Sequence, residues 1–529
     1  MFFTPNVETE TKPTTVPAPI GGLNAKDSLA AMPATDAIVM RNWWPQPYGC
    51  IVRKGYTAWT TGLPASVNTL ATWSATNGTQ KLFAWSGAGM YDVTAKGVAA
   101  AAIVSGLTSS IWQTVSMTNS AGTHLIAVNG QDNGIIYKPT GVARLILGDG
   151  IVVNTWAGLN PALAIQLTVH QRRLWAVEKN TSNGWFLPPD AFQGTFKKFD
   201  FGPLFSRGGF LRSLHTWTLD DGNGAEDHLV AISSRGEVAV YQGTDPEYDT
   251  TWSLVGVYFI GAPVSGRRSV TKIGGDLGIV TQQGVVSMTE TLASTKVNEA
   301  QSRLITEKIQ FLISELVSTY TDLADWELSY YPKLNMLMIN VPSVVLGGNI
   351  QLASNQIIES WTEFTEMDAA SWGGLASNPY FGDYQGNIWQ MWDGGQDKVG
   401  LDGTGGTSIL TDVQQAYSYY GALAVQKQVG MYRTNFLVSV PVQYASTVLY
   451  DYDTADLPAI GVLPPVGVSL WGVGLWGTAT WGGGQGIQKP WKSASGMGVA
   501  ASLRMVMQSE NDVLWISTDY SIIGGLGIL

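Results

Sequence analysis

The sequence HLVAISSRGEVAVYQG, from His228 to Gly243, contains the pattern from which the fold can be predicted. An apolar run leads into the polar segment Ser233–Gly236, and a second apolar run ends at the aromatic Tyr241. Two such runs separated by a short turn that contains glycine are typical of a β-hairpin. This stretch therefore predicts two antiparallel strands joined by a tight turn.

The same hairpin pattern recurs along the chain, and its copies start 43 to 57 residues apart. The six further copies begin at Lys81, His124, Arg173, Leu277, Leu334 and Pro379. A propeller blade of four antiparallel strands takes about 40 to 50 residues, so each interval holds one blade and its loops. The spacing predicts an all-β chain with a central β-propeller of five to seven blades over residues 63–394. One or two β-sandwiches are the alternative, although their turns recur without a longer period.

The two ends of the chain differ from this repeat. Residues 1–62 contain a segment rich in Pro and Thr, from Thr4 to Ile20, which is typical of an extended arm that docks on a neighbour. The Gly-rich sequence DGGQDKVGLDGTGGTS after the last hairpin has the composition of a linker. Strand-like sequence then resumes within residues 395–529. We expect the N- and C-terminal segments to form a β-rich platform, because propeller closure joins the first and last strands.

Residues 298–317 break the β pattern. Their apolar residues recur at helical spacing, which would place one set on a single face: Leu304, Ile305, Ile309, Leu312 and Leu316. This spacing predicts a helix packed on a blade, and a partner-binding helix is the alternative.

Composition excludes several classes of function. Charged residues make up 13% of the 529 residues, and the net charge is −11, which argues against a surface that grips nucleic-acid phosphates. The single Cys50 excludes an internal disulfide framework and a cysteine-based zinc site. Apolar stretches are too short to span a bilayer, and the N-terminus lacks the pattern of a signal peptide. We therefore expect synthesis in a bacterial cytoplasm and no membrane insertion.

A motif from Gly21 to Tyr56 stands out before the first hairpin. Its distinguishing residues are Gly21, Gly22, Leu23, Asn24, Asp27, Met32, Pro33, Asp36, Asn42, Trp43, Arg53, Lys54 and Gly55. The paired glycines permit a turn with positive φ. Pro33 and Asp36 predict the start of a short helix that Pro45 and Pro47 would end. A second motif, from Ser495 to Leu529, alternates small residues as a strand does.

These two motifs resemble the tail nozzle and hub proteins of short-tailed bacteriophages, of the tail tubular protein B and packaged-DNA stabilisation type. The resemblance covers the two ends of the chain, whereas the middle matches only in architecture. It implies a structural virion protein of the tail, made in the host cytoplasm. The residues from Gly21 to Gly55 would then form a docking motif.

The resemblance also implies partners. Such proteins form a ring, usually a homohexamer, attached to the tail adaptor ring below the portal. The ring surrounds the DNA-ejection channel, retains packaged DNA until the host is engaged, and anchors tail fibres or tailspikes. Double-stranded DNA would pass through the channel without sequence-specific binding.

No catalytic, cofactor-binding or metal site is expected. Gly472, Gly474 and Gly477 match a dinucleotide-binding pattern, but the following TATWGGG cannot begin a helix. The acidic segment Asp451–Asp456 lacks the Gly and the closing Glu of a calcium loop. The histidines lack metal-ligand spacing: His124, His170, His215 and His228.

The Trp-rich segment Val468–Trp491 is interpreted as a loop that contacts a neighbouring subunit through Trp471, Trp476 and Trp481, with packing inside one domain as the alternative. Basic pairs are isolated, and we expect salt-bridged surface turns or, alternatively, a ring of channel charge. These pairs are Arg172 and Arg173, Lys197 and Lys198, and Arg267 and Arg268.

The main rival function is a phage-tail propeller that binds or cleaves carbohydrate; a minor internal scaffolding protein is a third class. Aromatic and acidic residues could hold a sugar: Trp217, Asp220 and Asp221, and Trp392 and Asp393. Glycosidases need only two suitably spaced carboxylates, which makes this signal unspecific. Asp221 and Asp393 also precede glycine, as in tight turns.

Overall fold

The computed structural model describes residues 11–220, 225–293, 304–343, 349–457 and 486–524. The chain forms two compact units, which we call the propeller unit and the platform unit. The propeller unit comprises residues 58–351 and 367–391, and the platform unit comprises residues 1–57, 352–366 and 392–529. Residues 352–366 therefore belong with the two ends of the chain, although they lie inside the range expected for the propeller.

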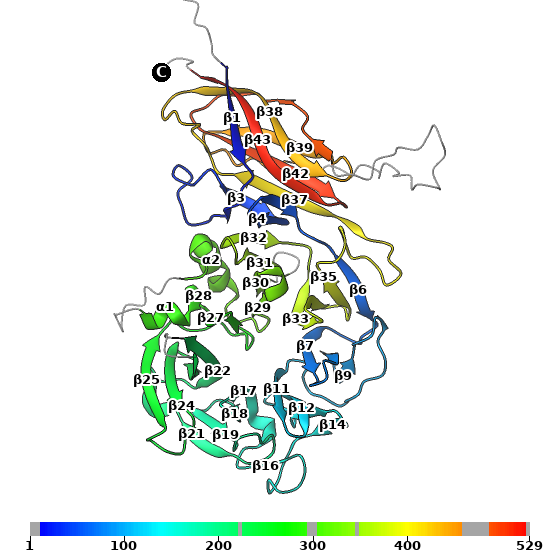
Figure 1. Ribbon diagram of the computed structural model, residues 1–529, viewed down its shortest axis with the longest axis vertical. Coiled ribbons are helices and arrows are strands. Elements are labelled where there is room, and N and C mark those ends of the chain that lie inside the picture. Colours follow the sequence, from blue (N-terminus) through cyan, green and yellow to red (C-terminus); the bar gives the residue numbers. More distant parts are fainter. Residues whose placement is uncertain (1–10, 221–224, 294–303, 344–348, 458–485, 525–529) are drawn as a thin grey trace, which may run out of the picture. The chain divides into compact units, whose positions relative to one another are not determined.

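Within its described residues, the propeller unit contains seven blades arranged around a common centre, together with one small accessory sheet (Figure 1). Blade one contains β10 (Gly97–Val98), β6 (Tyr56–Thr61), β35 (Ile388–Met391), β34 (Asn378–Asp383) and β33 (Ala369–Leu375). Blade two contains β7 (Val67–Ser74), β8 (Gln80–Ser86) and β9 (Gly89–Asp92), and blade three contains β11 (Gln113–Asn119), β12 (Gly122–Val128), β13 (Ile135–Lys138) and β14 (Gly141–Arg144). Blade four contains β17 (Ala164–His170), β18 (Arg173–Glu178), β19 (Asn183–Phe186) and β21 (Lys197–Asp200).

The remaining blades complete the ring. Blade five contains β22 (Leu211–Asp220), β23 (Ala225–Ser233), β24 (Glu237–Gly243) and β25 (Trp252–Phe259), and blade six contains β26 (Val270–Ile273), β27 (Asp276–Thr281) and β28 (Gly284–Ser287). Blade seven contains β29 (Glu327–Tyr331), β30 (Met336–Val341) and the first residues of β31 (Ile350–Asn355). A small accessory sheet contains β15 (Ile146–Leu147), β16 (Thr155–Ala157) and β20 (Gly194–Thr195).

The predicted all-β class and the central propeller are confirmed. Each of the seven predicted hairpins supplies two consecutive strands of one blade; residues 228–243, for example, contain most of β23 and all of β24. Those two strands pair antiparallel from His228 opposite Gln242 to Ile232 opposite Val238. Closure is also as expected, because β6 lies beside β35 and the Leu63 N–H donates to the Gly386 carbonyl at 3.1 Å.

The core of the propeller unit lies between neighbouring blades. One apolar cluster joins blades two and three through Trp73, Trp85 and Trp112, and another joins blades four and five through Trp175 and Trp252. Both faces of a blade are therefore covered, which explains why strands such as β23 contain the continuous apolar run LVAI.

Helices are few in the described ranges. The α-helices are α1 (Met288–Ala293) and α2 (Gln310–Tyr320), and the short 3-10 turns are Pro161–Leu163, Gly202–Leu204, Glu307–Ile309 and Pro332–Leu334. Of the α-helix expected over 298–317, residues 298–303 lie outside the described residues, α2 begins at Gln310, and Leu304 forms a β-bridge with Val286. The buried face uses Ile313 rather than Leu312. No helix among these residues has the length and apolar character needed to cross a bilayer.

The platform unit is built from two sheets. The first contains β4 (Trp43–Gln46), β5 (Gly49–Val52), β43 (Val513–Gly524), β38 (Lys427–Val438) and β40 (Gly486–Gln488), with β1 (Thr11–Pro17) beside β43 and β41 (Lys492–Ser493) beside β38. The second contains β32 (Ser360–Phe364), β2 (Gly22–Leu23), β3 (Asp36–Arg41), β37 (Thr407–Gln415), β42 (Ala501–Ser509) and β39 (Tyr444–Tyr450), with β36 (Gln396–Asp397) beside β37.

These two sheets pack face to face through aromatic residues. The ring of Phe436 on β38 lies 5.1 Å from that of Tyr444 on β39, and the Tyr432 hydroxyl donates to the Ser446 carbonyl at 2.8 Å. The platform predicted from the N- and C-terminal segments is confirmed. The short helix expected after Pro33 is wrong, because residues 36–41 form β3, which pairs with β2 and β37.

Candidate functional site

The first half of the Gly21–Gly55 motif is a loop organised by Asn24. The Asn24 side-chain oxygen accepts the backbone N–H groups of Lys26 and Asp27, each at 3.0 Å. Its amide nitrogen donates to Asp27 at 2.9 Å and to the buried Asp36 carboxylate at 2.7 Å. Asn24 thus holds the loop between β2 and β3 in one shape, as asparagine does in tight turns.

Two glycines of the motif allow close approaches of the backbone. Gly22 has φ +78°, and a Cβ there would meet the backbone of Trp361 in β32. A Cβ on Gly55 would collide with the carbonyl of Gln396 in β36. Both positions therefore require glycine, because the neighbouring backbone leaves no room for a side chain.

Arg53 is the centre of the second half of the motif, and its side chain is fully buried. It forms a bidentate pair with Asp397, with both N–O distances at 2.7 Å. It also donates to the Asn42 side chain at 2.8 Å and to the carbonyls of Lys54 and Thr365 at 3.1 and 2.9 Å. These five bonds match the five N–H donors of a guanidinium, so a lysine cannot replace it.

Asn42 extends this network to two further segments. Its backbone has φ 59°, a left-handed conformation that asparagine tolerates better than most residues. Its amide nitrogen donates to the Thr365 hydroxyl at 2.8 Å and to the Leu410 carbonyl at 2.7 Å. Its side-chain oxygen also accepts the Thr365 N–H at 2.9 Å. Asn42 and Arg53 together join β3–β5, the end of β32, β36 and β37.

The motif residues thus divide into buried and exposed sets. Those that the structure buries are Gly22, Leu23, Asn24, Met32, Asp36, Asn42, Trp43, Arg53 and Gly55, and Gly21 is half-buried. Asp27 and Pro33 are exposed, and Lys54 is partly exposed and paired with Asp512. Trp43 lies inside the platform against Trp515, with ring centroids 5.7 Å apart. A docking role stays a prediction, and in this unit Asp27, Pro33 and Lys54 are the motif residues that reach solvent.

Sequence reasoning missed the acidic partner of Arg53. Asp397 lies in the segment that we expected to be a linker, yet it is 2% exposed and belongs to β36. The Gly-rich composition around it hides this role. The available signal was Arg53 itself, because a buried guanidinium requires a carboxylate partner somewhere in the fold.

The Trp- and Gly-rich segment and the acidic segment are the next candidates from the sequence. Trp471, Trp476, Trp481 and the three glycines between Gly472 and Gly477 lie outside the described residues. In the acidic segment, Asp451 accepts the backbone N–H groups of Val499 and Ala500, and Asp456 pairs with Arg504. Across the described ranges, no group of three or more His, Cys, Asp and Glu residues is placed to hold a metal ion.

The histidines lie within the propeller unit. His170 on β17 is buried, with its ring 5.8 Å from that of Trp252 in blade five, and burial lowers its pKa to about 4. His215 on β22 is partly exposed and lies opposite Val230, on the side of blade five that packs against blade six; desolvation lowers its pKa to about 4 as well. The Thr216 hydroxyl lies 3.3 Å from His170 Nδ1. Two neutral imidazoles in an apolar contact act as packing groups.

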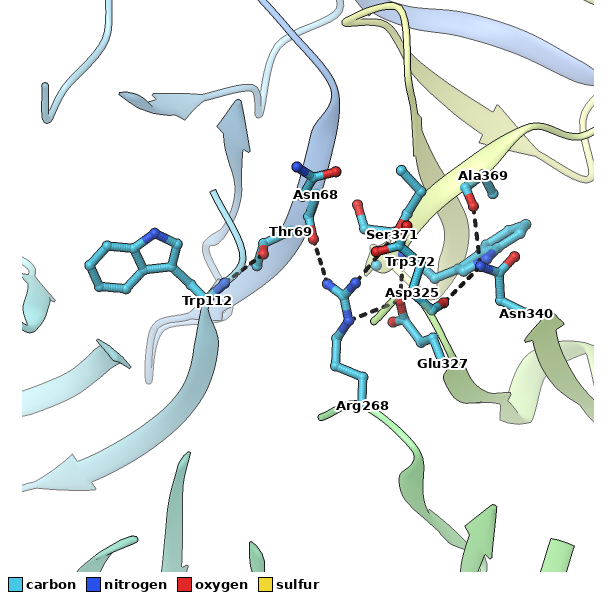
Figure 2. A network of polar contacts seen from close by, with 12 residues as sticks. Asn68, Thr69, Trp112, Arg268, Asp325, Glu327, Asn340, Ala369, Ser371 and Trp372 are labelled. Carbon is cyan, nitrogen blue, oxygen red and sulfur yellow. Dashed lines mark hydrogen bonds and ion pairs between the residues drawn. The ribbon is translucent and has the colours of Figure 1, made fainter. Parts of the chain in front are cut away.

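A second arginine network lies among the blades (Figure 2). Arg268, just before β26, donates to the carbonyl of Asn68 at 2.7 Å and to that of Ala370 at 3.4 Å. Its Nε lies 3.2 Å from Glu327, whose carboxylate also accepts the Trp372 N–H at 3.2 Å. Arg268 therefore links blade six to blades one, two and seven.

The preceding residue extends these links. Arg267 donates to the Asn129 carbonyl in blade three at 3.0 Å. The prediction of a salt-bridged surface turn at Arg267 and Arg268 is therefore wrong, since both side chains bond to the backbones of distant blades. Elsewhere, Arg172 pairs with Asp190, Arg173 with Asp245, and Lys197 with Glu247.

Comparisons with known proteins do not assign the chain to a family. No family model matches the chain, and no curated protein does. Solved structures with similarity include BBS1N in complex with ARL6DN, at 11% identity and TM-score 0.37 over 64% of this chain and 98% of that one. The Myceliophteria thermophila Cps50 (Swd1) β-propeller domain has 11% identity and TM-score 0.36 over 64% and 99%. The computationally designed Ika8 protein has 8% identity and TM-score 0.35 over 64% and 99%.

Proposed function

We propose that this chain is a structural subunit of a short-tailed phage tail, whose copies form a nozzle or hub ring around the DNA-ejection channel. The observation that supports this proposal is the buried network of Asn42, Arg53 and Asp397. Asn42 and Arg53, which belong to the motif that resembles nozzle proteins, therefore hold the segments of the platform unit together. A resemblance in such residues is a resemblance in fold-determining positions rather than in scattered surface residues.

The charge distribution is compatible with a conduit. Arg172, Arg173 and Lys197 are each paired with a carboxylate, and Arg267 and Arg268 bond to backbone carbonyls. Affinity for DNA comes mainly from Lys and Arg that are free to neutralise phosphates. With a net charge of −11, the chain would offer passing DNA little to bind.

The residues on which the carbohydrate alternative was based make contacts within the chain. Trp217 is 1% exposed, and its indole N–H donates to the Gly275 carbonyl at 3.1 Å. Trp392 packs edge-on against Trp44, with centroids 5.7 Å apart, and Asp393 accepts the Thr57 hydroxyl at 2.8 Å. Flat aromatic platforms for sugars must be exposed, whereas Trp217 is buried and Trp392 is only partly exposed. Asp221 lies outside the described residues.

Electron microscopy of the purified chain, alone and with the tail adaptor ring, tests the proposal. We expect a closed ring, usually of six copies, attached to the adaptor. Analytical ultracentrifugation would give the mass independently. A chain that stays monomeric with the adaptor present and hydrolyses bacterial polysaccharide would contradict the proposal.

The N-terminal arm offers a second test. Residues 11–17 form β1 on the edge of β43 of the same chain, and the Thr15 hydroxyl donates to Asp519 at 2.8 Å. We expect deletion of residues 1–17 to abolish ring attachment and to leave the propeller unit folded. Deletion of residues 1–10, which precede β1, is the matched control. Unchanged assembly after the longer deletion would show that the arm does not dock.

A further inference from the structure

The propeller unit contains a cavity of about 470 Å³ formed by loops of blades five and six. Its lining includes Arg207, Arg235 in the turn between β23 and β24, and Phe259 at the end of β25. Gln282 and Gln283, in the turn between β27 and β28, complete it. This volume lies within the roughly 300 to 1,000 Å³ typical of small-molecule sites.

One wall of the cavity, the loop at residues 206–207, is held in place by the buried carboxylate of Glu237. The Glu237 carboxylate, 4% exposed, accepts the N–H and hydroxyl of Ser206 at 3.0 and 2.7 Å and the Arg207 N–H at 2.8 Å. The Arg207 guanidinium lies 3.8 Å above the ring centroid of Phe259. The backbone and the head group of Arg207 are therefore both positioned before any ligand arrives.

The two arginines of the cavity have no carboxylate partner among the described residues. No acidic side chain lines the cavity, and both Glu237 oxygens already accept hydrogen bonds from the loop at 206–207. By contrast, the exposed Arg172 of blade four is paired with Asp190. Two positive charges thus converge on one cavity without compensation.

We propose that this cavity binds a small oxyanion, a carboxylate or phosphate group carried on a hydroxyl-bearing molecule. A guanidinium fork binds two oxygens of such a group at once, and two guanidiniums supply the matching charge. The amides of Gln282 and Gln283 can donate to and accept from hydroxyls. This inference goes beyond the role in the tail and does not depend on it.

Isothermal titration calorimetry of the full chain at low ionic strength tests the site, with D-glucuronate, glucose 6-phosphate and glucose as probes. We expect at least one anion to bind in the millimolar range or tighter and glucose to bind at least tenfold more weakly, because glucose lacks the charged group that the guanidiniums would bind. The probe that binds more tightly identifies carboxylate or phosphate as the preferred group.

Arg235→Gln is expected to weaken anion binding at least tenfold, and Arg207→Lys, which keeps the charge but loses the fork, several-fold. Arg172→Gln, at a paired arginine of blade four, is the matched control and should bind as the unaltered chain does. Circular dichroism checks that each variant folds. Absence of binding by both anions at about 10 mM, equal binding of glucose, or unchanged binding by Arg235→Gln would each overturn the proposal.

Discussion

Two arginines, Arg53 in the platform unit and Arg268 in the propeller unit, each join segments far apart in the sequence. The Arg53 side chain is 0% exposed, and both oxygens of one carboxylate, Asp397, bind it. The Arg268 side chain is 16% exposed; it contacts one oxygen of Glu327 and two backbone carbonyls. The platform network therefore depends on one charge pair, whereas Arg268 distributes its bonds over several blades.

This difference predicts how strongly each unit is destabilised when its arginine is replaced. Removal of one partner of a fully buried pair leaves a charge without compensation in a medium of low dielectric constant. Around Arg268 the blades are also held by apolar clusters between neighbouring sheets, such as that of Trp73, Trp85 and Trp112. Burial raises the pKa of Glu327, and the nearby Arg268 guanidinium opposes that change.

The largest effect is expected from Arg53→Met. Loss of the guanidinium leaves Asp397 buried and unpaired, so the free energy of unfolding of the platform unit should fall by about 3 to 5 kcal/mol. Urea unfolding combined with hydrogen exchange of β3 and β37 measures this change. The double variant Arg53→Met with Asp397→Leu should recover part of the loss, and a single variant as stable as the parent would show that the pair is dispensable.

Arg268→Met should destabilise the propeller unit by about 2 kcal/mol, because charge-assisted bonds to two carbonyls and one carboxylate are lost. Faster hydrogen exchange should appear in β29 and β33, whose residues bond to Arg268. Arg172→Met, at an exposed pair of the same unit, is the control and should change little. A loss of stability larger than that caused by Arg53→Met would contradict the expectation that the platform unit depends more strongly on its arginine.

Acid should weaken the propeller unit through His170 and His215. Their folded pKa of about 4 lies below the ordinary 6.5, so the unfolded chain binds more protons between these values. Stability is therefore fully present above about pH 6.5 and is lost as the pH falls toward 4, by about 1 kcal/mol per histidine between pH 7 and 5.5. His215→Gln should reduce this slope in urea unfolding at several pH values; an unchanged slope would assign it to other groups.

The smallest effect is expected from Lys54→Gln, next to Arg53 in the same motif. Lys54 pairs with Asp512 at the surface, and their side chains are 31% and 61% exposed. Such a pair contributes roughly 0 to 1 kcal/mol and less in high salt. Unfolding measured in low and high salt checks this. If Lys54→Gln lowers the free energy of unfolding as much as Arg53→Met does, the loss depends on membership of the motif rather than on burial of the side chain.

Sequence reasoning succeeded where the signal was local. Each hairpin carries its own apolar runs and turn, as in residues 228–243, so the blades could be located without knowing their neighbours. It failed where partners are remote. Residues 36–41 form a strand because β2 and β37 lie beside them, and the proline pattern around Pro33 does not reveal those neighbours.

The all-β class and the repeated hairpins follow from the amino-acid sequence alone, because strand pairing across a tight turn needs only residues that are close in the chain. The sequence also singled out Asn42, Arg53 and the glycines of the motif as unusual. Only the tertiary structure decided that Arg53 binds Asp397 and that Arg268 joins four blades. Arg53 and Asp397 are 344 residues apart in the sequence, and Arg268 and Asn68 are 200 apart. No local sequence pattern predicts contacts between residues so far apart.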